Sequence, residues 1–599
     1  MDRQAWIAVT LCVIGLVAWQ FYMASHAPRV QPTAAVATPS ASPAPEAQSA
    51  PSATPTRSPV GDAAVGVAPA PTPAESIETF EEKIEPLRNA SVELRLTNRG
   101  GGISEVHLLN HADEKGQGAV VLNSADHPPI GAILEQPLAR ALPEFTATRQ
   151  ADGSVQFERR TPQGIVVQKR FSFVPTADNE DNFVTEMQLD FRNEGAAPYT
   201  AAEYFLALGS TVPLHPNDMT VYTRLVWFAS GKVKSTDVNW FPAQSYPVIG
   251  VEKRGPKEFF QERVNSGDWA GMSNQFFTTL LTPLTAKATE VWARPFDVNH
   301  EGGRPLLGLE GAMGMPGFQL QPGETNSLHF QIYAGPKIYN RLAKLEHGEA
   351  EIMNFGFFKL ISQALLNFLN LLHGWVKNYG FAIILLTACV KGVLWPLQNK
   401  ANKSMRRMSA LAPKMQALKE KYKDDPTRMN TEVMKLYKEH GVNPVGGCLP
   451  MMIQIPIFFG LFSMLGQAAE LRNASFLWVR DLSQPDTLFT IPGMGWIPIL
   501  GNPVVGGLPI NILPLLMGAS NVWLMRMTPN TGDAMQRRVM MFMPLIFLVF
   551  CYNFAAALAL YYTTQNLFTI LQLWHNQRQP APVLDIAPTT TKRARKGRS

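Results

Sequence analysis

The segment YGFAIILLTACVKGVLWPL, residues 379–397, decides the fold class of this chain. It carries a single charge, Lys391, and its length is close to the ~20 residues that a helix needs to cross a bilayer. Four more apolar runs follow it, at residues 448–466, 508–525, 539–553 and 556–574. The sequence therefore predicts an α-helical membrane domain with five spans over residues 375–575.

The last two apolar runs are nearly continuous, from residue 539 to residue 574. As one helix they would be ~54 Å long at a rise of ~1.5 Å per residue. The hydrocarbon core of a bilayer is only ~30 Å thick. We therefore expect the chain to turn near residues 553–557.

An uncharged run at residues 6–24 predicts a sixth span near the N-terminus. A cleaved signal peptide is the alternative, but its apolar region is usually only ~7–15 residues long. Pro28 follows the small residues 25–27 directly and disfavours cleavage there. We expect an uncleaved anchor at residues 1–26. Residues 27–76 are rich in Ala, Pro, Ser and Thr, which predicts an extended tether.

Residues 77–340 change to short runs in which apolar and polar residues alternate, the pattern of half-buried strands. Residues 155–160 and 165–173 flank a Pro/Gly turn and predict a hairpin. Further strands are expected at residues 92–96, 183–191 and 328–333. The pattern predicts a large antiparallel β-sandwich.

Residues 341–374 return to helical spacing, with Phe357, Leu360 and Leu365 on one apolar face and Lys359 on another. This pattern predicts an amphipathic helix that lies in the plane of the membrane interface. The alternative is a helix of the β domain's own core.

Basic residues set the orientation, since Lys and Arg are retained on the cytoplasmic side of a membrane. They outnumber acidic residues in segments 398–447 and 526–538, but not in segment 467–507. The tail, residues 576–599, carries a basic cluster that includes Lys592, Arg593, Arg595 and Lys596. Both termini are therefore expected in the cytoplasm and the β domain in the periplasm.

Segment 398–442 predicts a helical hairpin, because two apolar stripes flank a break at residues 424–426. Its outer faces are basic, and the candidate recruitment residues are Arg406, Arg407, Lys414 and Lys419. Such a surface suits ribosomal RNA, anionic lipid or acidic client segments. An ordinary solvated loop is the alternative.

Lys391 needs an explanation, because an ionisable residue within a span is costly and usually faces water or a functional partner. The alternative is that its long side chain reaches the headgroups by snorkelling. Pro450 and Pro456 leave backbone carbonyls without helical partners in the next span. A polar interior is therefore expected, with Gln454 as a contributor.

Signatures of catalysis are missing from the sequence: it has no H-E-x-x-H, G-x-S-x-G or P-loop motif. Its four cysteines lie in apolar runs and have no metal-ligand spacing. We expect neither an enzyme nor a bound cofactor or metal.

The string N-P-x-G-G-C-x-P-x-x-x-Q-x-P-I-F, residues 443–458, follows the basic hairpin and resembles the YidC family of membrane protein insertases. Segments 470–472, 481–483 and 560–562 support the resemblance, which covers residues 355–575. It implies a hydrophilic groove that is open to cytoplasm and lipid. The groove residues that it implies here are Lys391, Thr387, Gln454, Tyr562 and Gln565. The β domain resembles a sugar-mutarotase-like sandwich, and the resemblance does not imply that activity.

Two departures from the family pattern matter. The family usually has Arg where this chain has Lys391, and a lysine can lose its proton when it is dehydrated. A hydrated groove is therefore a requirement of the mechanism. Residues 554–557 also lack the Pro or Gly that often breaks the chain before the last span.

The resemblance implies an insertase and chaperone for inner-membrane proteins, acting alone or with the Sec translocon. Its expected partners are nascent inner-membrane proteins, the Sec translocon, the ribosome and membrane lipids. A solute transporter would require inverted repeats, which the sequence does not display. An envelope-assembly scaffold without insertase activity is the other alternative.

Overall fold

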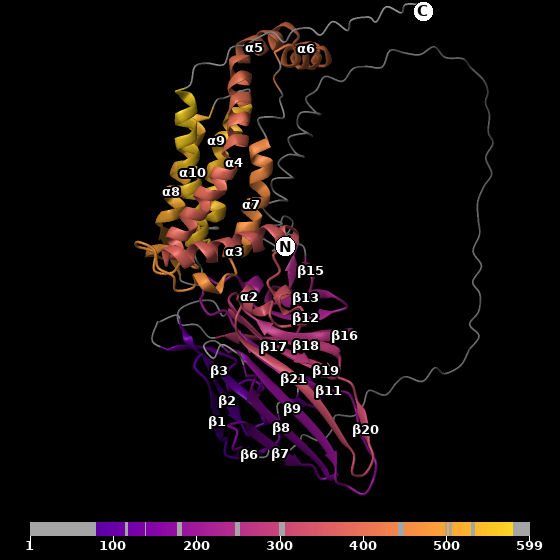
Figure 1. Cartoon of the computed structure of the whole chain (residues 1–599). Helices are drawn as coiled ribbons and strands as arrows, with labels where there is room; N and C mark the ends of the chain where they lie inside the picture. Colours follow the sequence, from indigo (N-terminus) through magenta and orange to yellow (C-terminus); the bar gives the residue numbers. More distant parts are fainter. Residues whose placement is uncertain are drawn as a thin grey trace, which may run out of the picture.

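The computed structural model describes most of the chain after residue 79. The described residues are 80–113, 118–137, 139, 141–175, 182–245, 252–298, 306–440, 442, 449–497, 500–501, 506–528 and 534–578. The expected anchor, tether and tail cluster at 592–596 lie outside them. The described part consists of a β domain and a helix bundle stacked end to end (Figure 1).

The β domain is built around a 13-stranded antiparallel sheet with the order β5-β11-β19-β18-β16-β17-β21-β9-β8-β7-β6, to which β12 and β13 are added beside β16. Its strands are β5 (Ile133–Leu134), β6 (Thr146–Arg149), β7 (Val155–Arg160), β8 (Ile165–Phe173), β9 (Val184–Asn193), β11 (Tyr204–Thr211), β12 (Arg224–Ala229), β13 (Lys232–Asp237), β16 (Phe260–Ser273), β17 (Phe277–Pro283), β18 (Ala288–Val298), β19 (Leu306–Met315) and β21 (Thr325–Pro336).

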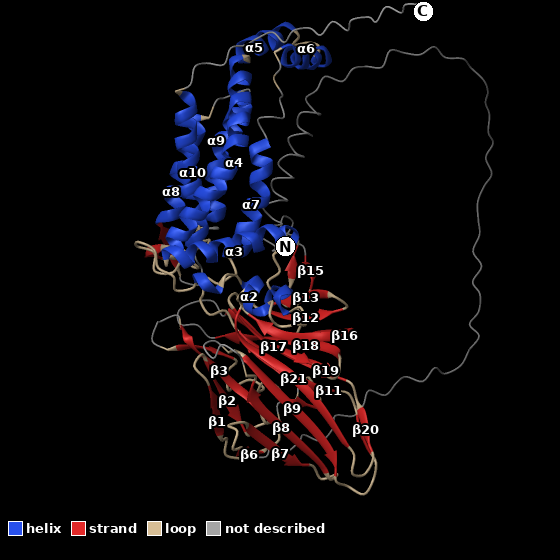
Figure 2. Cartoon of the chain, in the orientation of Figure 1, coloured by secondary structure: helices blue, strands red, loops and turns tan. Residues whose placement is uncertain are grey.

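A second sheet of four strands lies beside the first (Figure 2). It contains β1 (Ile84–Arg88), β2 (Val92–Thr97), β3 (Gly102–Ala112) and β4 (Ala119–Leu122). Three small pairs complete the strands: β10 (Tyr199–Ala201) with β20 (Phe318–Leu320), β14 (Gln244–Ser245) with β15 (Glu252–Arg254), and β22 (Thr487–Pro492) with β23 (Gly507–Asn511).

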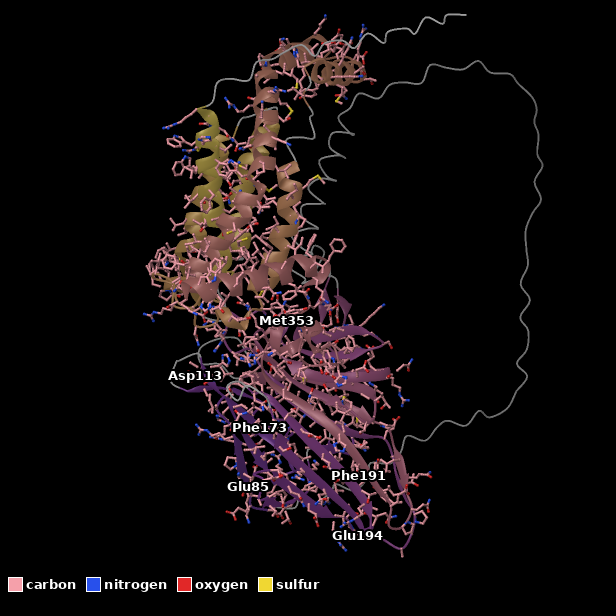
Figure 3. All side chains as sticks on the ribbon, in the orientation of Figure 1. Glu85, Asp113, Phe173, Phe191, Glu194 and Met353 are labelled. Carbon is pink, nitrogen blue, oxygen red and sulfur yellow. The ribbon has the colours of Figure 1, made fainter. Side chains whose placement is uncertain are left out.

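The antiparallel β domain that the sequence predicts is confirmed. Its strands alternate as expected: in β9, every second residue is buried over most of the strand. Between β2 and β3 the chain turns at Gly100 and Gly101, whose φ angles of 74° and 56° favour glycine. Figure 3 shows Glu85 and Glu194 at the end of this domain away from the helices and Met353 at the opposite end.

Several ionisable side chains are buried in the β domain, and Lys169 is one of them. Lys169 of β8 is fully buried, and its Nζ donates to the backbone carbonyls of Gly100 (2.8 Å), Gly101 (3.0 Å) and Gly131 (2.8 Å). Burial lowers the pKa of Lys169 to about 7. The three carbonyls match the three N–H groups of its charged form, so Lys169 ties two turns to the sheet.

The helices of the described part belong mainly to the second half of the chain. They are α2 (Tyr339–Leu342), α3 (Lys359–Val376), α4 (Tyr379–Ala410), α5 (Ala412–Lys421), α6 (Pro426–Glu439), α7 (Leu449–Leu465), α8 (Ile512–Met527), α9 (Ala534–Cys551) and α10 (Ala556–Gln577), with 3-10 turns at Thr220–Tyr222, Val238–Trp240, Glu349–Ile352, Gly356–Phe358 and Ala469–Leu471.

Helix α4, with 32 residues, is the one helix among the described residues that is long and apolar enough to cross a bilayer by length and composition. Shorter apolar helices are Met452–Leu465, Ile512–Met527 and Phe542–Cys551. The turn expected near 553–557 is present, because α9 ends at Cys551 and α10 begins at Ala556.

Three expected boundaries differ from the structure. The helix expected at 341–374 is divided into α2, two 3-10 turns and α3, because Gly348 and Gly356 adopt φ angles of 80° and 64°. Helix α4 continues through Pro396 to Ala410, well past the expected end at residue 397. The run expected to be helical from residue 508 begins instead as strand β23.

The helix bundle is apolar on its outside and polar within. Large apolar side chains that are exposed on α4, α7, α8, α9 and α10 include Val393 78%, Met452 61%, Trp523 55%, Ile546 61% and Leu571 52%. Gln398, Gln565, Asn566 and Gln572 are buried. This arrangement is the one that lipid favours, since polar groups in a membrane face the interior of a bundle.

Helix α3 lies across the end of the bundle nearest the β domain (Figure 1). It buries Leu366, Leu369 and Leu372, and it exposes Leu360 (82%) and Trp375 (73%). The hydroxyl of Ser362 donates to the carbonyl of Gly460 in α7 (3.0 Å). The amphipathic segment thus contacts the helix bundle through one face and leaves the other uncovered.

Hydrogen bonds join the β domain to the bundle. Gln275 Nε2 donates to the Gly466 carbonyl (3.0 Å), and Gln484 Nε2 donates to Asp218 Oδ1 (2.8 Å). Burial raises the pKa of Asp218. The backbone N–H of Ala556, the first residue of α10, donates to the Gln484 carbonyl (2.8 Å).

Candidate functional site

One face of α10 carries polar side chains along most of its length. Gln565, Thr569, Gln572 and Asn576 recur at intervals of three and four residues, which places them on one side of a helix. They meet polar residues of α4 and α7, and we call the combined set the polar seam. Its members are Lys391, Gln398, Asn399, Gln454, Gln565, Thr569, Gln572 and Asn576.

Lys391 lies at the middle of the polar seam. Its Nζ donates to Thr569 Oγ1 (2.7 Å) and to Gln398 Oε1 (3.3 Å). The Thr569 hydroxyl donates in turn to the carbonyl of Gln565 (2.7 Å). Lys391 is only 6% exposed. Its ammonium therefore contacts protein oxygens between α4 and α10.

Gln454 and Gln565 connect α7 with α10. Gln454 Nε2 donates to Gln565 Oε1 at 2.8 Å, and the Gln565 side chain is buried. The two amides thus continue the polar seam from Thr569 toward the β domain.

The polar seam continues toward the end of α4 away from the β domain. Gln572 Nε2 (2.8 Å) and Asn576 Nδ2 (3.1 Å) both donate to Asn399 Oδ1. Arg406 Nη1 donates to the Asn576 carbonyl (2.7 Å). A small pocket adjoins this end, lined by Asn402, Arg406, Met527, Leu573, Asn576 and Gln577.

Two of the expected groove residues do not contact Lys391. Thr387 is fully buried one helical turn before Lys391, and its hydroxyl donates to the Ile383 carbonyl (2.6 Å) instead of hydrogen-bonding to the Lys391 side chain. Tyr562 is half-buried in an aromatic cluster, with ring centroids 5.4 Å from Phe458 and 5.1 Å from Phe547. It precedes Thr569 by about two helical turns, or ~10 Å of rise.

The helical hairpin beyond α4 is formed by α5 and α6. Leu411, Met415, Tyr437 and Val442 form its small core. Of the candidate recruitment residues, Lys414 is exposed, Arg407 and Lys419 are half-buried, and Arg406 binds α10. Residues 443–448 of the family motif lie outside the described residues.

Sequence reasoning missed most of the residues that hold Lys391 and extend the polar seam. They are Gln398, Asn399, Thr569, Gln572 and Asn576. The helical spacing of the polar residues on α10 could have indicated a polar face. The sequence offers no means of telling that α4 runs beside that face.

Acidic groups lie at the bundle end near the β domain. Asp486 Oδ2 accepts from the Leu513 backbone N–H (2.7 Å) and from Trp478 Nε1 (3.2 Å), so it caps the start of α8. Burial raises the pKa of Asp486, and it also raises the pKa of Glu470.

Comparison with known proteins identifies both halves of the chain. The family described as 60Kd inner membrane protein matches residues 371–581, and the YidC periplasmic domain matches residues 86–368. Membrane protein insertase YidC of Nitratidesulfovibrio vulgaris is 30% identical over 597 residues, covering 96% of this chain and 98% of the relative.

Two other matches are partial or distant. Membrane protein insertase YidC of Syntrophobacter fumaroxidans is 38% identical over 338 residues, and the match spans 55% of this chain and 58% of that relative. A crystal structure titled as an active YidC insertase with its first transmembrane domain resolved matches with 18% identity and a TM-score of 0.33, covering 84% of this chain and 94% of that one.

Proposed function

This chain belongs to the YidC family of membrane protein insertases, and we propose that it passes the polar flank of a client protein along the polar seam. It is an inner-membrane protein with a periplasmic β domain, and its substrates are nascent membrane proteins. We also propose the route of the client, the topology of the chain and its further partners.

The observation that carries the proposal is the buried contact between Lys391 and Thr569 within the polar interior of the bundle. A charge at the bilayer centre costs ~2.5–3.5 kcal/mol on insertion scales, and such charges mark functional sites. An acidic client flank brings oxygens that can take the place of Thr569 and Gln398 on the ammonium. When the flank enters, the Lys391 ammonium therefore exchanges its hydrogen bonds to the protein for hydrogen bonds to the flank.

Entry of the flank requires α4 and α10 to separate beside Lys391. Water follows, because a dehydrated ammonium is costly. Gln454 and Gln565 then offer further hydrogen bonds, and the aromatic cluster around Tyr562 contacts the apolar segment of the client. Transfer of that segment into lipid supplies the drive, at ~25 cal/mol per Å² of apolar surface. Thr387, one helical turn before Lys391 in α4, donates to the Ile383 carbonyl and supports its own helix.

We place both termini in the cytoplasm, with six spans: the anchor within residues 1–26 and five in the core at 375–575. The tether at 27–76, the β domain at 77–340 and the amphipathic segment at 341–374 then lie outside or at the outer surface. The distribution of Lys and Arg supports this orientation, and the apolar exterior of the bundle supports a lipid environment.

Basic segments supply the proposed contacts on the cytoplasmic side. Lys414 and Lys419 of α5 and the tail cluster at 592–596 attract ribosomal RNA and anionic headgroups. Cooperation with the Sec translocon is proposed for clients with large polar domains, because a polar seam of this size offers room only for a short flank.

Reconstitution of the pure full-length protein in liposomes, with one small client that carries an acidic flank, tests the proposal. Lys391→Glu should reduce insertion about tenfold, equivalent to ~1.4 kcal/mol, and Lys391→Arg should retain it. A client with a neutral flank should be affected less by the charge reversal.

The matched control is Lys232→Glu, which reverses an exposed lysine of the β domain. It should leave insertion unchanged. Undiminished insertion of the acidic client by Lys391→Glu would remove Lys391 from the mechanism.

A further inference from the structure

Residues 487–511, between α7 and α8, contain no Asp, Glu, Lys or Arg. They fold back on themselves as the antiparallel pair β22 and β23, whose register joins Thr487 with Asn511 and Pro492 with Gly507. We call this pair the apolar hairpin. Within residues 487–511, the structure describes 487–497, 500–501 and 506–511.

The apolar hairpin exposes most of its large side chains. They are Leu488 59%, Phe489 56%, Ile491 36%, Met494 40% and Trp496 77%. Phe489 and Ile491 are two residues apart in β22, so they point to the same face. Their partners in β23 are Ile510 and Leu508, which are half-buried, and Leu488 lies at a bulge. This face is therefore apolar and largely uncovered, whereas Gly507, Pro509 and Asn511 of β23 are buried.

This hairpin is poorly suited to water. In the described part of the chain, β22 and β23 pair only with each other. An isolated two-stranded hairpin is at best marginally stable in water. Exposed edge strands in soluble proteins are usually protected by charges, and this hairpin has none.

The base of the hairpin is fixed to the ends of the membrane helices. Asn511 Nδ2 donates to the Tyr552 carbonyl just after α9 (2.8 Å), and the Tyr552 hydroxyl donates to the Pro509 carbonyl (2.8 Å). Asp486 caps the start of α8, which follows β23 directly. Figure 2 shows the strands beside the bundle, near the level of α3.

We propose that the apolar hairpin lies in the headgroup–acyl boundary of the periplasmic leaflet and binds lipid there. The uncovered apolar face, the lack of charge and the position at the start of α8 fit this environment, and Trp is favoured at that depth.

The backbone limits how deep the hairpin can lie. The outer edges of β22 and β23 have N–H and C=O groups without strand partners, and hydrocarbon cannot satisfy them. A depth of ~5–10 Å, where water still reaches these edges, satisfies both the side chains and the backbone. The hairpin then fixes the depth at which α8 enters the membrane.

Spin labels test this placement. In a full-length variant whose native cysteines are replaced and whose insertion activity is retained, Leu488→Cys, Phe489→Cys and Trp496→Cys each carry a nitroxide. The protein is reconstituted in vesicles of phosphatidylethanolamine and phosphatidylglycerol. Collision rates with oxygen, which prefers lipid, and with a water-soluble nickel chelate are then measured.

All three positions should give oxygen-to-nickel ratios severalfold above that of Leu284→Cys, a position in the β domain with similar exposure, 46%. Ratios equal to that of position 284 would place the hairpin in water and overturn the proposal. Low collision rates with both reagents would show a protein partner and overturn it as well.

Discussion

Thr569 is the residue that gives Lys391 a fixed position. Its hydroxyl accepts from the ammonium and donates to the Gln565 carbonyl, so its orientation is set by its own helix. Serine can repeat both contacts, whereas valine can repeat neither. Position 569 therefore tests whether the placement of the Lys391 charge matters for insertion, separately from the presence of that charge.

We expect Thr569→Val to lower insertion of a client with an acidic flank by about tenfold or more, because a hydrogen bond to a charged group contributes about 1.5 kcal/mol or more. Thr569→Ser should restore it. The measurement is insertion in liposomes, with Thr563→Val as the control, since its hydroxyl donates only to its own helix at Ala559. Equal activity of Thr569→Val and the native chain would contradict a positioning role.

Lys169 gives a prediction on stability and its pH dependence. Lys169→Met leaves three buried carbonyls without a donor, so β8 should open more easily, at a cost on the order of 1–3 kcal/mol. The pKa of Lys169 is about 7 when folded and ~10.4 when unfolded. Between these values the unfolded chain binds more protons, so Lys169 favours folding more as pH rises from 7 to 10.

Hydrogen exchange of peptides covering residues 165–173, in the native protein and in Lys169→Met at each pH, checks both effects. At pH 7 these peptides should exchange more slowly in the native protein than in Lys169→Met. The difference in the free energy of opening between the two proteins should grow by up to about 1.4 kcal/mol per pH unit above pH 7. A difference in protection that stays constant or shrinks as pH rises would contradict the lowered pKa of Lys169.

At the scale of elements, the proposed client route requires the interface between α4 and α10 to open. Asn399 and Gln572 face each other across it, and Ser520 and Asn566 face each other across α8 and α10. The two contacts lie on different sides of α10, so they offer a matched pair of positions for restraint.

We expect a short bifunctional thiol reagent joining Asn399→Cys to Gln572→Cys to block insertion, because the polar seam can no longer separate. Reduction of the link should restore activity. The same link between Ser520→Cys and Asn566→Cys should leave most activity intact. Insertion of a fluorescent client before and after reduction is the measurement, and full activity of the first linked pair would show that α4 and α10 stay together.

Most elements could be predicted from the sequence, for reasons that differ between them. Strands β7, β8 and β9 follow from period-two alternation, and the turn before α10 follows from length alone. The pair β22 and β23 could not be predicted, because a uniformly apolar run has no period. In the same way, Lys391 stood out as a charge in a span, but its partner Thr569 is 178 positions away, which no local pattern reveals.

At the scale of the whole molecule, one hydrophobic core runs through the β domain and the bundle, and a few amide contacts between them add to it. Gln275 and Gln484 carry two of these contacts, and Arg472 also donates to the Ala112 carbonyl. Inter-domain contacts of this kind are polar and modest in strength. The relative position of the two bodies should therefore respond to loss of these side chains.

We expect Gln275→Ala with Gln484→Ala to broaden the distribution of distances between a spin label in the β domain and one in α4. Pulsed electron resonance measures the distribution. Gln150→Ala, which removes an amide contact with Gln156 inside the β domain, is the control and should leave it narrow. An unchanged distribution in the double variant would show that other contacts fix the two bodies.

Gln484 holds Asp218 through its side chain and the first N–H of α10 through its carbonyl. A single residue is thus a mechanical link between the periplasmic body and the helix that carries Thr569. We expect a displacement of the β domain to move the first turn of α10 through these two hydrogen bonds. Under the proposed route, the position of the outer domain would then influence the separation of α4 and α10.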